Sequence, residues 1–339
     1  MADAPPIDPA QAHELASHKH DRALVSCDWE PTGRWIVFGA EDSAVHRLAA
    51  DASAALVLPG VGPAVHDSWV WALGHAPDGS RVFTGGYDGR LGAWPLGEPG
   101  PAAWLIEAHA GWIRGVAISP DGATIATCGN DRLVKLWRAA DGAALATCPG
   151  HESHVYAVAW RPDGQGLVSC DLKGFVKEWN AAGGPVRDVG RAEALWKYDT
   201  QFRADIGGAR TIAFRADGGQ VAVGGITAVS NAFAGVGHPA VCLLDFADGK
   251  QALVQEPKEK QQGVCWGIAW HPQGYWVSVA GGGGGGWLRF FKPGEAAEFH
   301  ALKLAANGRG LSLAPDGRRV AVALADGTLR LYGLFAKQA

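Results

Sequence analysis

The stretch HAGWIRGVAISPDGATIATCGNDRLVKLW, residues 109–137, contains the pattern that decides the fold. Two apolar runs, VAISP and ATIATCG, meet at a Pro-Asp-Gly turn, and a second polar turn leads into the short alternating strand LVKLW. Such turns are typical of β-hairpins, because Pro fixes one backbone angle and Gly accepts left-handed conformations. The stretch therefore predicts short antiparallel strands joined by tight turns.

The same turn recurs along the whole chain. It reads EPTG, APDG, SPDG, RPDG, RADG, HPQG and APDG, with successive spacings of 46, 43, 42, 54, 56 and 43 residues. Self-similarity at this period is typical of repeat proteins, in which each copy is one supersecondary unit. The seven turns lie at Pro31, Pro77, Pro120, Pro162, Ala216, Pro272 and Pro315.

Two further marks keep a fixed distance from the turn. Eleven residues before it lies a histidine in four repeats: His20, His66, His109 and His151. Seventeen residues after it, a short strand ends at Leu48, Trp94, Trp137, Trp179 or Tyr332. Six residues before that strand end stand Asp42, Asp88, Asp131 and Asp326. Marks that stay in register over so many copies favour one all-β repeat domain.

Between residues 11 and 335 these marks resemble the WD40 family. The resemblance implies an all-β, seven-bladed β-propeller with four antiparallel strands in each blade, tied by a buried His–Ser/Thr–Asp–Trp network. Two repeats have all four members, and in repeat four Lys173 replaces the Asp. The network positions are His66, Thr84, Asp88, Trp94, His109, Thr127, Asp131, Trp137, His151, Ser169 and Trp179. Asp205, Gln261 and Leu304 replace the His in repeats five to seven, where the network is absent or different.

The network contains the side chains of a Ser/His/Asp catalytic triad, but its recurrence points to a structural role. A buried imidazole needs partners for both nitrogens, which an Asp and a hydroxyl can supply. A catalytic site that is needed once would not recur at blade spacing. We therefore expect no catalytic residues and no enzyme activity.

Chain length predicts how the ring closes. After Tyr332 the segment GLFAKQA has only seven residues, too few for a fourth strand and its loop. We expect Gln11–His18 to supply that strand, which removes an open sheet edge. Residues 1–10, rich in Pro and Ala, are expected to form a disordered tail, and residues 11–339 a single propeller.

Composition narrows the classes of partner. The net charge is −4 with no run of Lys or Arg, which argues against a nucleic-acid partner. No signal-like segment and no apolar run of about 20 residues argue against a membrane. The six cysteines form no CxxC pair, which favours buried reduced thiols in a cytoplasmic protein. We also expect the protein to be monomeric when alone. No cofactor is expected, and no metal, because the groups His13/His18/His20 and His151/His154 lack a Cys or carboxylate set at ligand spacing.

Departures from the regular repeat point to one face. In the family that these residues resemble, the loop before the first strand and the turn between the second and third strands open on the same face, called the top. Insertions in repeat proteins often map to the binding face. Three departures fall in such segments: 191–208, 225–239 and the glycine run Gly281–Gly286. The run is either a flexible turn or an anion-binding nest of backbone N–H groups.

Aromatic and arginine side chains follow the same pattern. Positions at the start of each first strand are expected to face the top and the central channel, and these residue types dominate interface hot spots. Trp69 and Trp112 have a second interpretation, as caps of their blades. The expected partner-binding residues are Trp69, Trp71, Trp112, Arg114, His154, Tyr156, Arg210, Trp266 and Arg309.

Two functions fit this pattern. The first is a non-catalytic scaffold that binds a protein or peptide on the top face and channel mouth. The second is a small-ligand or enzymatic site at the mouth, built by the insertions of repeat five and the glycine run. Its polar candidates are Asp199, Arg203, Asp205 and His238.

Overall fold

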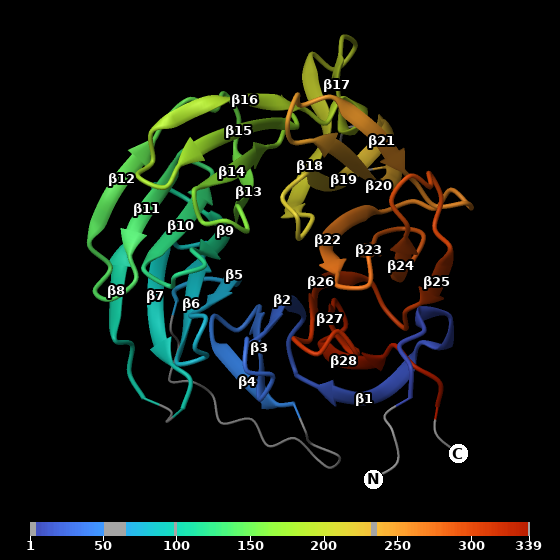
Figure 1. The fold of residues 1–339 in the computed structure, drawn as a ribbon, viewed down its shortest axis with the longest axis horizontal. Helices are drawn as coiled ribbons and strands as arrows, with labels where there is room; N and C mark the ends of the chain where they lie inside the picture. Colours follow the sequence, from blue (N-terminus) through green and yellow to red (C-terminus); the bar gives the residue numbers. More distant parts are fainter. Residues whose placement is uncertain (1–4, 51–65, 98–99, 232–235, 338–339) are drawn as a thin grey trace.

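The computed structural model describes residues 5–50, 66–97, 100–231 and 236–337. Seven antiparallel sheets surround a central opening, and their innermost strands face it (Figure 1). The fold is the expected all-β, seven-bladed β-propeller. No helix in the described part of the chain is long and apolar enough to cross a membrane.

The strands follow one another blade by blade. Blade one has β2 (Leu24–Trp29), β3 (Trp35–Ala40) and β4 (Val45–Ala49). Blade two has β5 (Val70–His75), β6 (Arg81–Gly86), β7 (Arg90–Pro95) and β8 (Trp104–Glu107). Blade three has β9 (Ile113–Ile118), β10 (Thr124–Gly129), β11 (Val134–Arg138) and β12 (Ala144–Cys148). Blade four has β13 (Val155–Trp160), β14 (Gly166–Asp171), β15 (Phe175–Asn180) and β16 (Pro185–Arg191).

The second half of the ring is less regular. Blade five has β17 (Trp196–Asp199), β18 (Ala204–Phe214), β19 (Gln220–Asn231), β20 (Val236–Asp245) and β21 (Gln251–Gln255). Blade six has β22 (Val264–His271), β23 (Tyr275–Gly281), β24 (Trp287–Phe291) and β25 (His300–Lys303). Blade seven has β26 (Gly308–Leu313), β27 (Arg319–Leu324) and β28 (Thr328–Gly333), completed by β1 (His13–Lys19). Two single-turn 3-10 helices are η1 (Pro9–Gln11) and η2 (Glu193–Leu195).

The core lies between the blades. Each pair of neighbouring blades shares one buried apolar cluster, so the described residues form seven such clusters around the ring. Between blades two and three, for example, Phe83 and Leu91 pack against Ile113 and Ile125. Both faces of a middle strand are therefore covered, and every residue of β14 is buried. This explains why the strands are nearly continuous apolar runs and not simple alternations.

The buried networks join the strands within a blade. In blade three, Trp137 Nε1 donates to Thr127 Oγ1 at 2.8 Å, His109 Nε2 lies 2.7 Å from the same hydroxyl, and His109 Nδ1 lies 2.8 Å from Asp131 Oδ1. The hydrogen bonds can all run in one direction: the Trp N–H donates to the hydroxyl, the hydroxyl to the imidazole, and the imidazole to the carboxylate. Blade two repeats the arrangement with Trp94, Thr84, His66 and Asp88 at 2.8–3.0 Å.

Blade four corrects the sequence interpretation. Lys173 stands where the acid was expected, but Asp171 Oδ2 lies 3.1 Å from His151 Nδ1 and completes the network. The acid therefore comes from the end of β14, two residues earlier in the chain. Ser169 joins Trp179 and His151 at 2.8 and 2.7 Å, as in the other two blades. Lys173 instead pairs with Asp205 of blade five at 3.3 Å.

The N-terminal strand closes the ring as expected. β1 runs antiparallel to β28, so the first strand of the chain completes the last blade (Figure 1). It begins at His13, two residues later than the expected start. The segment before it also contacts blade seven, where Ile7 bridges Phe335 and the Asp8 amide donates to Leu334 O at 2.8 Å. The expected disordered tail over 1–10 therefore differs from the structure at these residues, while residues 1–4 lie outside the described part.

Removing one network hydroxyl should destabilise the ring. Thr127→Val keeps the side-chain shape but leaves two buried nitrogen atoms, on His109 and Trp137, without a partner. Because each unsatisfied buried group costs about 1–3 kcal/mol, we expect the free energy of unfolding to fall by about 2–5 kcal/mol in denaturant titrations. Thr147→Val, at an exposed site in β12 of the same blade, is the control and should change little. Equal stability of the two variants would contradict the structural role of the network.

Removing the closing strand should expose an edge. A chain that lacks residues 1–19 leaves β28 without its partner, and an open β-edge favours pairing between molecules. We expect a melting temperature lower by several degrees and concentration-dependent oligomers in size-exclusion chromatography with light scattering. A chain that lacks residues 1–4 is the control. A shortened chain that stays monomeric with an unchanged melting temperature would contradict closure by β1.

Candidate binding site at the channel mouth

A β-bulge in each inner strand builds the site. In all seven blades the pairing between the first and second strands skips one residue at this point. A bulge takes a residue out of the regular alternation and re-aims its side chain. The skipped residues, here called the bulge ring, are Val25, Trp71, Arg114, Tyr156, Arg210, Trp266 and Arg309, and all of them line a central cavity of about 350 Å³.

Antiparallel order assigns the bulge ring to one end of the channel. In six blades the bulge lies within the first three residues of the inner strand, and in blade five it lies at Arg210, within β18. Each second strand runs from its turn back toward the bulge, so the turns between second and third strands open at the same end of the channel as the bulge ring. Six of the nine expected partner-binding residues belong to this ring; Trp69, Trp112 and His154 lie just before their inner strands and do not line the cavity.

Arg114 is held by neutral groups. Its Nε donates to Asn130 Oδ1 at 2.9 Å, and one terminal nitrogen donates to the Tyr87 hydroxyl at 3.0 Å. The guanidinium lies 4.5 Å from the Trp112 ring centroid and 4.6 Å from that of Tyr156. These contacts orient the cation, and no carboxylate among the described residues forms an ion pair with it. An aromatic face compensates such a charge only in part.

Arg210 of blade five also contacts the Tyr156 ring. Its guanidinium is 4.7 Å from the Tyr156 centroid and 5.9 Å from that of Trp266, and it donates to the Ala209 carbonyl at 2.9 Å. Burial lowers the pKa of Arg210 below its ordinary value, because desolvation disfavours the charged form. Arg309 has an acidic neighbour, Glu41, at 3.5 Å. The bulge ring thus carries three arginines, and one of them, Arg309, is paired with a carboxylate outside the ring.

Trp71 and Trp266 meet although they belong to blades two and six. Their ring centroids are 5.9 Å apart at 73°, an edge-to-face contact of the kind that aromatic pairs prefer. The bulge ring therefore has an aromatic part next to its cationic part.

Tyr87 is a site residue that the repeat pattern did not indicate. It follows β6, in the turn before Asp88, and its ring stacks on Trp112 with centroids 4.1 Å apart and planes 3° apart. Trp69 stacks on it as well, at 5.7 Å. Asn130 has the same place before Asp131, so the residue before the network acid reaches the mouth in both blades. That position is the signal that could have identified Tyr87.

Trp112 and His154 border the mouth. The Trp112 side chain covers Tyr87 yet stays 42% exposed, so capping and partner contact are both open to it. Burial and the positive charges of Arg114 and Arg132 lower the pKa of His154, which favours its neutral imidazole near neutral pH.

The acid in the cavity wall lies toward the opposite end. Asp28 stands near the end of β2, next to the first Pro-Thr-Gly turn. Burial raises the pKa of Asp28, against the opposing effects of His75 and of the Ser312 hydroxyl, which donates to it at 2.8 Å. The polar neighbours of Asp28 are thus a hydroxyl and an imidazole from the two neighbouring blades.

The insertions of blade five form hairpins outside the cavity. β17 pairs with the start of β18, and β19 and β20 continue their pairing as far as Asn231 and Val236 (Figure 1). Ile206, Ile226 and Val229 bury a small apolar cluster between them. The described residues of these insertions are not part of the cavity lining, and part of the second insertion, 232–235, lies outside the described residues.

The polar residues of the small-ligand hypothesis are not brought together at the cavity. Asp205 contacts Lys173 and Trp196, and His238 Nδ1 lies 3.1 Å from Gln261 O. Asp199 accepts hydrogen bonds from the backbone of its own turn, at Gln201 and Phe202. None of these, nor Arg203, lines the cavity.

The glycine run is a packed turn. A Cβ at Gly286 would lie 1.9 Å from Ala306 O, and one at Gly282 would lie 2.6 Å from the Gly263 Cα. The Gly284 and Gly282 amides already donate to Gln262 O and to Asn307 Oδ1, at 2.7 and 3.1 Å. Close backbone packing therefore accounts for these glycines without an anion.

One known family profile matches part of the chain. The sequence profile of the WD domain, G-beta repeat, matches residues 64–94, 103–138 and 142–180. The second and third ranges each begin with the outer strand of the preceding blade. Together the three ranges cover the first three strands of blades two to four, the blades that contain the complete His–Ser/Thr–Asp–Trp network. A search of curated proteins found no significant match. The three matched repeats, together with the seven-bladed ring that contains them, show that this chain is a WD40-repeat β-propeller.

Proposed function

We propose that the protein is a non-catalytic scaffold that binds an acidic peptide segment of a partner protein at its channel mouth. The observation that carries this proposal is the bulge ring, in which Arg114 and Arg210 make their hydrogen bonds to neutral oxygen atoms. WD40 propellers are typically protein-interaction scaffolds, which agrees with this role.

Charge supports an anionic partner. A buried or half-buried cation is costly unless an opposite charge accompanies it, and Arg210 already shows this cost as a lowered pKa. A carboxylate that enters the mouth would compensate both guanidinium groups. Guanidinium forks bind carboxylates through paired N–H donors, which adds direction to the attraction.

The aromatic part of the ring supports a peptide over a small anion. Trp71 and Trp266 present large rigid rings beside the cations, and Tyr87 with Trp112 extends this surface outward. Such rings bury much area for little loss of entropy, so they suit side chains that flank an acidic residue.

The cysteines support an intracellular setting for this partner. All six are free and buried, so we place the protein in a reducing compartment, the cytoplasm.

Peptide selection tests the proposal. A displayed library of acidic, neutral and basic peptides, selected on the full chain, should be enriched in acidic sequences. Arg114→Gln and Arg210→Gln should each weaken the selected peptide by about 30-fold or more in fluorescence polarisation, since a truncated buried charge pair costs about 2 kcal/mol or more. Trp266→Ala should also weaken it, with melting temperatures nearly unchanged.

The matched control lies at the other end of the channel. Arg138→Gln changes an exposed arginine beside the Pro-Asp-Gly turns and should leave binding as it is. Enrichment of neutral or basic peptides, or an equal loss of binding in the control, would contradict the proposal. A loss of binding that follows a large fall in melting temperature would show that these arginines are structural.

A further inference from the structure

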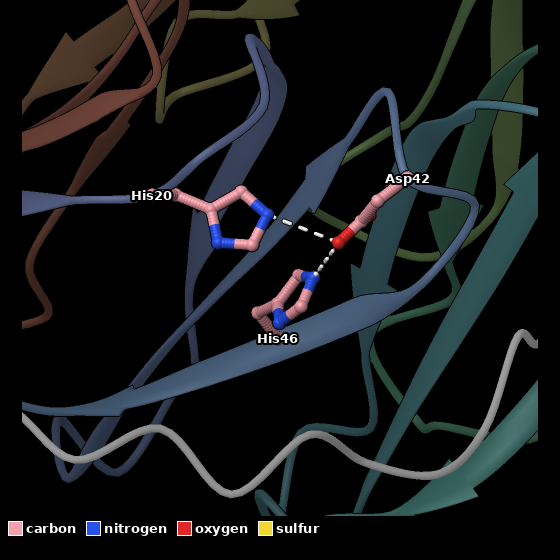
Figure 2. A group of neighbouring side chains, drawn as sticks. All are labelled: His20, Asp42 and His46. Carbon is pink, nitrogen blue, oxygen red and sulfur yellow. Dashed lines mark hydrogen bonds and ion pairs between the residues drawn. The ribbon is translucent and has the colours of Figure 1, made fainter.

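Two imidazoles and a carboxylate converge in blade one, at residues that do not line the central cavity. His20 Nε2 and His46 Nε2 lie 3.0 and 2.7 Å from the same oxygen, Asp42 Oδ2 (Figure 2). One ligand atom from each of the three residues lies within 4.8 Å of the others. The side chains of His20, His46 and Asp42 are 12%, 12% and 23% exposed, so the group is sheltered but reachable.

This arrangement differs from the networks of the other blades. In blades two to four the His uses Nδ1 toward the acid and Nε2 toward a hydroxyl. Blade one has Phe38 at the hydroxyl position, and His20 turns Nε2 to the acid instead. His46 takes the place that Lys135 has in blade three, where the ammonium lies 3.6 Å from Asp131. A cation is thus replaced by a group that can donate a lone pair to a metal.

Neighbouring groups orient the three side chains. The Ala44 amide donates to Asp42 Oδ1 at 3.1 Å, which leaves Oδ2 directed at the imidazoles. His46 stacks on the buried ring of Phe38 at 5.0 Å and 20°, and His20 meets that ring edge-on at 5.8 Å. Orientation of ligands by such neighbours is a usual property of metal sites.

Asp21, whose side chain is 83% exposed, offers a further carboxylate next to His20. Asp21 Oδ1 lies 3.3 Å from His20 Nε2, so one nitrogen faces two carboxylate oxygens. A single N–H cannot donate fully to both, whereas a cation between them can bind all of these atoms. Tetrahedral zinc with bonds of about 2.0–2.2 Å has ligand-to-ligand edges of about 3.3–3.6 Å. The observed nitrogen-to-oxygen distances of 2.7–3.3 Å are shorter than or equal to these edges, so the side chains must move slightly apart to accept the ion.

We propose that His20, Asp42 and His46, together with Asp21, bind a divalent transition-metal ion of the zinc class. The donor set is two imidazoles and two carboxylates, which suits borderline ions such as Zn²⁺. His13 is not part of it and instead stacks on Phe335 at 5.5 Å. Spacing along the chain did not indicate this site, because its acids and His46 come from separate turns and strands that only the fold brings to His20.

The location gives the ion a structural role. His20 directly follows β1, the strand that completes blade seven, and its amide donates to Gly327 O at 2.7 Å. Asp42 and His46 belong to the β3–β4 turn and β4 of blade one. A bound ion would therefore tie the closing strand to blade one, at the seam of the ring.

Zinc titration of the full chain tests this site. The protein, freed of metal with a chelator, should bind one Zn²⁺ in competition with a chromogenic chelator, and its melting temperature should rise with Zn²⁺. His46→Gln should weaken binding by at least about 100-fold, since loss of an outer-shell partner alone costs about 10–100-fold. His13→Gln is the matched control, a nearby histidine outside the group, and should bind as the unchanged chain does.

X-ray absorption of the zinc-loaded, unchanged chain keeps the test independent of the folding of any variant. We expect two imidazoles and oxygen ligands, without the longer Zn–S distance of about 2.3 Å. Absence of binding, equal affinity in His46→Gln, or a spectrum with sulfur or one imidazole would overturn the proposal. The first two results would mean that both histidines donate to Asp42 as a hydrogen-bonded network without metal.

Discussion

Burial of both faces of every sheet is the constraint on which this structure depends. Each blade packs against two neighbours, and seven apolar clusters, one at each interface, make the ring continuous. A buried polar group then needs a partner inside the ring, and the Trp–Thr–His–Asp chains supply one within a blade. The same constraint makes ring closure necessary, since an unpaired last blade would leave an open edge beside β28.

The buried faces of the blades are closed to partners, whereas the ends of the inner strands border the channel. The bulges in the inner strands turn one residue of each blade into the channel, and seven residues distant in sequence line one cavity there. The sheets supply rigidity while these positions remain free to vary. Their identity, three arginines with tryptophans and a tyrosine, gives the mouth an unbalanced positive charge within a chain whose net charge is −4.

Sequence periodicity predicted the seven blades, the closing strand and six of the bulge-ring residues, because each depends on spacing from a recurring turn. It did not predict the bulges themselves, since a skipped pair is a property of two strands. It missed Asp171 because an acid two positions early still reaches His151 once β14 is formed. It missed Tyr87 and the His20–Asp42–His46 group because stacking and convergence arise from separate turns. The insertions of blade five were expected at the mouth, but their hairpins pack on each other and lie outside the cavity lining.

A crystal structure of the full chain with a peptide selected by it would show whether the bulge ring receives an acidic side chain. We expect a carboxylate within hydrogen-bonding distance, about 2.7–2.9 Å, of the Arg114 or Arg210 guanidinium, with a flanking side chain against Trp71 and Trp266. A peptide seated on the blade-five hairpins or on the outer strands, with the arginines unchanged, would contradict it.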